Sequence, residues 1–105
     1  MNDPHAKDNQ SAGDNPEEMR SALFAQLVMQ QASMAMMLLG KTPHPETGQT
    51  VRDLEAAKYF IDQLEMLEVK TKGNLEEAET RLLQSLIYDL RVAYVDAQPK
   101  GSKGA

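Results

Sequence analysis

Apolar side chains recur at three- and four-residue steps along three stretches of the chain. In the second stretch these positions include Leu54, Ala57, Ile61 and Leu64. Such spacing places the apolar residues on one side of an α-helix. No stretch alternates apolar and polar residues with period two, as a half-buried strand does. We therefore predict an all-α fold, a three-helix bundle with helices at about residues 16–39, 53–72 and 75–97.

Residues that begin and end helices stand at the edges of these stretches. Asn15 is a good N-terminal cap, and Pro16 suits the first helical position, where the missing N–H costs nothing. Gly40 ends the same stretch. Asn74, with Glu77 three residues later, has the spacing of a capping box, which predicts the start of the third helix there.

The two predicted connections differ in length. Residues 70–74 form a short turn, so the second and third helices should fold back as an antiparallel hairpin beside the long first helix. Residues 40–52 are longer, but their prolines preset the backbone and Gly48 permits a positive φ, so we expect an ordered turn that either routes the chain or serves as an epitope. The predicted turn residues are Pro43, Pro45, Glu46, Thr47, Gly48, Gly73 and Asn74.

The first predicted helix has no charged residue from Ser21 to Gly40, and five of the seven methionines lie between Met19 and Met37. A three-helix bundle usually buries one stripe of each helix, whereas apolar residues here spread around the circumference. Because an uncovered apolar patch usually marks an interface, we expect a homo-oligomer or a protein partner on this helix. The expected interface residues are Leu27, Val28, Gln31, Met34, Met36, Met37 and Leu38.

A membrane is the alternative partner for the same helix. Twenty residues would just cross the hydrocarbon core of a bilayer, which is about 30 Å thick. The polar side chains of Gln26, Gln30, Gln31 and Ser33 would then have to be hidden from lipid. A helix that lies on a bilayer usually has a polar face rich in Lys and Arg, and this segment has none. The pattern favours a protein partner.

Composition argues against several chemistries. The 105 residues include no cysteine, which excludes disulfides, thiolate metal sites and a cysteine nucleophile. Sixteen acidic and eleven basic residues give a formal charge of −5 without a basic stripe, so nucleic acid is not expected to bind directly. His5 and His44 are too far apart in sequence to share a metal on one helix. We predict no catalytic, cofactor-binding or metal-binding residue; a small ligand-binding domain using His44, Tyr88 and Tyr94 is the second alternative.

The two ends of the chain are polar. Residues 1–14 and 98–105 contain too few apolar side chains to offset the entropy lost on ordering, so we predict disordered tails around a helical domain at 15–97. The first of these segments lacks the basic start and apolar run of a signal peptide. We therefore expect a cytoplasmic protein.

Several short motifs resemble a known family. They are DLEAAK at 53–58, LIYDLR at 86–91 and, most specific, the PETG turn at 45–48 and KTKGNL at 70–75. Over roughly residues 20–96 the chain resembles the bacterial family called domain of unknown function 1844. The resemblance implies a short helical cytoplasmic protein of bacteria, and it brings no activity, cofactor or catalytic residue with it.

Overall fold

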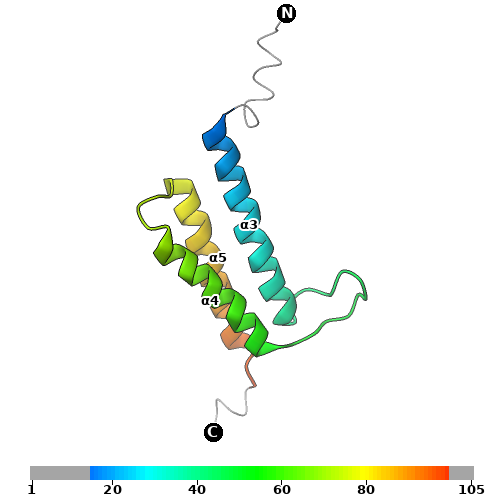
Figure 1. The fold of residues 1–105 in the computed structure, drawn as a ribbon. Helices are drawn as coiled ribbons and strands as arrows, with labels where there is room; N and C mark the ends of the chain where they lie inside the picture. Colours follow the sequence, from blue (N-terminus) through cyan, green and yellow to red (C-terminus); the bar gives the residue numbers. More distant parts are fainter. Residues whose placement is uncertain (1–14, 100–105) are drawn as a thin grey trace, which may run out of the picture.

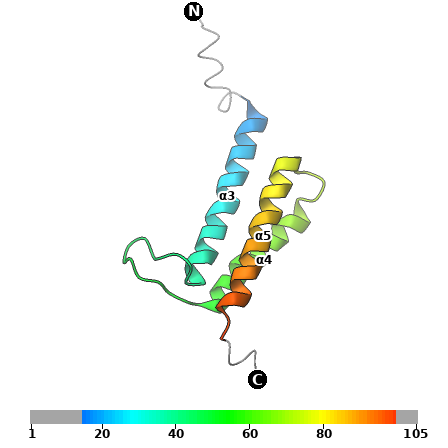
Figure 2. The same cartoon turned by 180° about the vertical axis from the view of Figure 1, so that it is seen from behind.

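Three helices pack side by side in the computed structural model, which describes residues 15–99 (Figure 1). They are α3 (Pro16–Leu38), α4 (Leu54–Lys70) and α5 (Glu77–Ala97). The hairpin of α4 and α5 is antiparallel and lies against α3 (Figure 2). The predicted all-α three-helix fold is confirmed. Of the predicted tails, residues 1–14 and 100–105 lie outside the described residues.

Capping hydrogen bonds explain where α3 begins and ends. The side chain of Asn15 accepts hydrogen bonds from the N–H groups of Glu17 and Glu18, and Pro16 occupies the first turn, as predicted. At the other end Gly40 has φ of +80°. The N–H of Gly40 donates to the carbonyl of Met37, and the N–H of Lys41 donates to that of Met36. This is a Schellman motif, which needs the left-handed residue that glycine supplies.

The start of α5 differs from the prediction. Glu76 is the N-terminal cap, and its N–H donates to the side chain of Glu79 at 2.8 Å in a capping box two residues later than expected. Asn74 does not cap the helix, because it still belongs to the turn: its N–H donates to the carbonyl of Thr71, just after Gly73 with φ of +87°. Leu75 then packs against the core before the helix begins.

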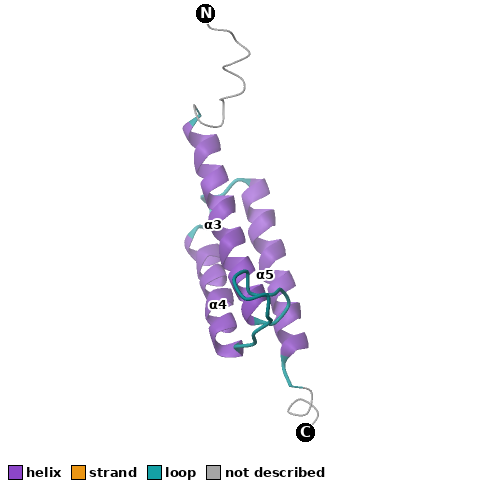
Figure 3. Cartoon of the chain, turned by 90° about the vertical axis from the view of Figure 1, so that its right-hand side faces the viewer, coloured by secondary structure: helices purple, strands orange, loops and turns teal. Residues whose placement is uncertain are grey.

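The core lies along the line where the three helices meet, and each helix contacts the other two (Figure 3). The hairpin contributes mainly large residues, among them Leu64, Leu83 and Leu90, which are fully buried. The contribution of α3 is smaller: its buried residues are Val28, Ala32 and Ala35. Small side chains let α3 approach the hairpin closely, so the size of the residues on its inner side sets the spacing of the bundle.

Ion pairs join the elements at the surface. Arg91 of α5 pairs with Glu65 of α4. Lys41, just after α3, lies 2.6 Å from a carboxylate oxygen of Asp96 near the end of α5. Because these side chains are exposed or half-exposed, each pair contributes about 1 kcal/mol or less. The apolar core therefore supplies most of the stability.

Candidate functional site

The side of α3 that points away from the hairpin is the candidate site; we call it the outer face. It is charge-free and carries large apolar side chains that the bundle leaves open to solvent. Their exposed fractions are 40% for Met19, 56% for Leu23, 46% for Leu27, 50% for Met29 and 42% for Met34. Gln26, Gln30 and Ser33 lie exposed between them. Exposed apolar side chains therefore gather along this side of α3, which makes it the candidate for a contact surface.

The structure divides the predicted interface residues between two environments. Leu27 and Met34 are exposed on the outer face, and Met37 is half-buried at the edge of a groove. Val28 has no exposed surface, so its assignment to an interface is wrong. Successive residues on a helix are about 100° apart, so Val28 turns inward where Leu27 turns outward.

Two further residues of the predicted interface contribute more to the core than to the outer face. Met36 and Leu38 are partly buried and pack against the core. A charged substitution at either position would therefore damage the fold as well as any interface. Leu23 and Met29 are better exposed, but the sequence does not single them out, because α3 has no single apolar stripe to mark its inner side.

Gln31 links α3 to α4. Its Nε2 donates to Oε1 of Gln63 at 2.8 Å, and Gln31 is half-buried. The two helices run antiparallel (Figure 1), so Leu27 lies about level with Leu67, and Met34 lies about level with Phe60. Their sequence neighbours Met66 and Tyr59 are 46% and 61% exposed, so α4 also carries large apolar side chains on its surface. Sequence alone does not give the register of two helices, so these residues were not predicted.

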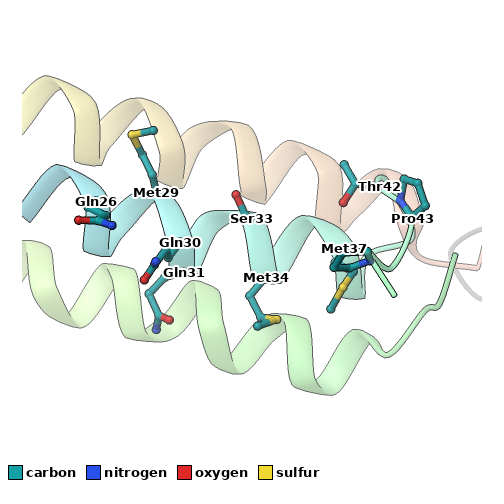
Figure 4. Close-up of a pocket in the computed structure, with 10 residues that line it drawn as sticks. Gln26, Met29, Gln30, Gln31, Ser33, Met34, Met37, Thr42 and Pro43 are labelled. Atoms are coloured by element: carbon teal, nitrogen blue, oxygen red, sulfur yellow. The ribbon is translucent and has the colours of Figure 1, made fainter. Parts of the chain in front are cut away.

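An open groove runs between the outer face and the connection after α3. Figure 4 shows its side chains: Gln31 and Met34 point toward α4, and Met29 points toward α5. Thr42 and Pro43 border the groove at the end of α3. The lining is mainly thioether and amide, without an ionisable group. A groove of this kind suits an apolar segment of a protein better than a charged small molecule.

The connection between α3 and α4 is an ordered, hydrogen-bonded turn. The N–H of His44 donates to the carbonyl of Gln49, and the N–H of Gly48 donates back to the carbonyl of His44, each at 2.8 Å. His44 Nδ1 accepts from the N–H of Glu46, and Thr47 Oγ1 accepts from the N–H of Gln49. Gly48 has the positive φ expected of it, +75°. The ring of His44 therefore holds the turn together, while Pro43 and Pro45 are exposed.

The ionisable groups with shifted pKa values act within or between helices. The side chain of Asp62, hydrogen-bonded at 2.9 Å and oppositely charged, raises the pKa of Lys58. The N–H of Glu76 lowers the pKa of Glu79, and a hydrogen bond with Ser21 of α3 adds to this effect. Neither group faces the groove. Both shifts thus come from fold-stabilising contacts.

The residues that the ligand-binding hypothesis would need lie apart from one another. Tyr88 is exposed on α5, whereas Tyr94 packs against the core, and His44 lies in the turn. Within residues 15–99 no three His, Asp or Glu side chains gather in a way that could hold a metal ion. No helix in that same range combines the length and apolarity needed to cross a membrane.

Comparison with known proteins agrees with the motifs seen in the sequence. No curated protein and no solved structure matches the chain. A family model matches residues 21–96, which include most of α3, all of α4 and all but the last residue of α5. The outer face and the PETG turn both fall inside the matched range. The chain therefore belongs to the family described as Domain of unknown function (DUF1844).

Proposed function

We propose that this protein is a non-enzymatic helical interaction protein that binds an apolar protein helix on the outer face of α3. The observation that carries the proposal is the distribution of side-chain size around α3. In α3, Val28, Ala32 and Ala35 are buried against the hairpin and Phe24, Met36 and Leu38 are partly buried there, whereas four large apolar side chains stay 42–56% exposed: Leu23, Leu27, Met29 and Met34. A helix that only completed its own bundle would carry its large apolar residues on the inside.

The chemistry of the outer face supports a protein partner. Its polar groups are amides and a hydroxyl, and its apolar groups are flexible thioethers and leucines, which pack against another helix without needing a charged counterpart. An anionic lipid surface would be bound by Lys or Arg, which the stretch from Ser21 to Gly40 lacks. As the compartment we propose the bacterial cytoplasm, as the family resemblance suggests.

Site-specific photo-cross-linking in the producing cell tests the proposal. A photoreactive residue would replace Leu27 on α3 or, as a control, Val92, which is equally exposed on α5. We expect a defined protein adduct from position 27 only. The purified adduct partner should bind the chain and lose at least tenfold in affinity to Leu27→Gln but not to Val92→Gln. Adducts absent from position 27, or equal at both positions, would overturn the proposal.

A further inference from the structure

The outer face carries a regular row of mostly apolar residues. Leu23, Leu27, Gln30, Met34 and Met37 follow one another at steps of four, three, four and three residues. This is the a/d spacing of a two-helix seam, with one polar residue in the middle. The same spacing on α4 and α5 includes charged residues, such as Asp62 and Arg81. Among the described helices α3 has the longest charge-free seam, and a shorter charge-free row lies on α5: Ser85, Tyr88, Val92 and Val95.

Two properties of this seam favour a second copy of the chain as its occupant. The chain has a formal charge of −5, so two copies repel each other least where they meet through a charge-free surface. The amide of Gln30 contains both a donor and an acceptor, so it can pair with the same amide of another copy. A carboxylate or an ammonium group at that position could not pair with itself.

The shape of the molecule indicates the orientation. The first turns of α3 project beyond the hairpin (Figure 1), because Ser21 already lies beside Glu79 at the start of α5. At the opposite end of α3, Thr42 and Pro43 line the end of the groove. In an antiparallel pair centred on Gln30, facing positions sum to 60, so 23 faces 37, 19 faces 41, and the apolar positions 27 and 34 face the polar positions 33 and 26. The projecting end of each α3 then enters the groove of its partner.

The available surface limits how strong such a pair is. From Met19 to Met37 the seam is about 27 Å long, and with a helix width of about 10 Å it covers roughly 300 Å² on each copy. A stable dimer buries about 800 Å² of accessible surface on each partner. The turn at Thr42 and Pro43 and the exposed Tyr59 and Met66 of α4 add to the contact. We therefore expect a weak dimer.

We propose that the protein is an antiparallel homodimer in which the outer faces of two α3 helices pack together and Gln30 lies on the two-fold axis. This inference rests on the proposed function, since it names the occupant of the same surface. It adds a specific geometry that the docking of another protein would not require.

Sedimentation of the full chain and of two single-charge variants tests the pairing. Gln30→Glu keeps the shape of the side chain but sets two carboxylates against each other, and it should weaken dimerisation at least tenfold. Ser85→Glu adds the same charge on the exposed side of α5 and should leave the dimer unchanged. Equal thermal melting of both variants as monomers excludes a folding defect. A dimer that resists Gln30→Glu would overturn the proposal.

Engineered cysteines test the orientation, because the chain has no cysteine of its own. Gln30→Cys should form a disulfide-linked dimer under mild oxidation. Leu23→Cys and Met37→Cys should link when mixed, whereas Leu23→Cys alone should not. A Leu23→Cys homodimer would indicate parallel helices and refute the antiparallel pair. A chain that stays monomeric at about 100 μM refutes the dimer. A cross-linked adduct between position 27 and a different protein would still support the proposed function.

Discussion

The rotation of α3 about its own axis decides which residues form the core and which form the outer face. Leu27 and Val28 test it, because they are adjacent in sequence but differ completely in exposure. We consider Leu27→Gln and Val28→Gln. Glutamine already occurs at positions 26, 30 and 31 of the same helix and is a good helix former, so the backbone tolerates it.

The two substitutions differ in what they bury. Val28→Gln places an amide without a partner in the core, at a cost of about 1–3 kcal/mol, and forces a longer side chain into a packed site, at a cost of about 1–3 kcal/mol. A total near 4 kcal/mol should lower the Tm by roughly 20 °C, since each kcal/mol is worth about 4–8 °C in a domain of this size. Leu27 is already 46% exposed, so Leu27→Gln loses about 1 kcal/mol of burial.

Thermal melting followed by circular dichroism measures both effects. The protein should be kept well below micromolar concentration, so that self-association does not add to the Tm. If Leu27→Gln is as destabilising as Val28→Gln, both side chains are buried, and α3 is rotated by about 50°, half the angle between the two residues. The outer face would then be wrongly assigned, and the proposals that rest on it would fail.

Three other substitutions test local features of the fold. Gly40→Ala should cost about 1–2 kcal/mol in urea unfolding, because φ is +80° there and a Cβ would lie 3.2 Å from the carbonyl oxygen of Val51; unchanged stability would contradict the Schellman motif. The folded pKa of Glu79 is lowered from 4.5, so its charge stabilises the fold above pH 4.5 and this contribution is lost as the pH falls through the folded pKa. The stability difference between wild type and Glu79→Gln should therefore shrink between pH 6 and pH 3 in urea titrations, and a constant difference would refute the assignment. Arg91→Gln removes the exposed pair with Glu65 and should cost less than about 1 kcal/mol, with a loss above about 2 kcal/mol indicating a larger role.

Helix positions were predictable from sequence because local signals mark them. The cap at Asn15, the stop at Gly40 and the positive φ at Gly73 depend on neighbouring residues alone. The start of α5 was misplaced for the same kind of reason: two capping boxes compete within a few residues. The helix begins at the one at Glu76, because the N–H of Asn74 is still bonded within the turn to the carbonyl of Thr71.

The surface of α3 was harder to predict because its apolar residues surround the helix. An amphipathic helix shows its buried side in the sequence, as α4 and α5 do, whereas α3 has no single apolar stripe. Val28 and Leu27 look equivalent until the helix is set against the hairpin. The contact of Gln31 with Gln63, which fixes the level of α4 beside α3, depends on packing between distant segments. For the same reason, the exposed Tyr59 and Met66 of α4 could not be placed beside α3 from the sequence.

The inner side of α3 explains why its outer side is so apolar. Ala32 and Ala35 allow the hairpin to approach closely, and together with the partly buried Phe24, Met36 and Leu38 they complete the inner side of α3 without Leu23 or Met34. Leu23 and Met34 thus add little to the stability of a monomer, where exposed polar residues would serve equally well and resist aggregation better. These apolar side chains would contribute binding free energy if a second surface covered them. Under the proposed function, the fold acts as a scaffold that presents the apolar outer face of α3 to a partner.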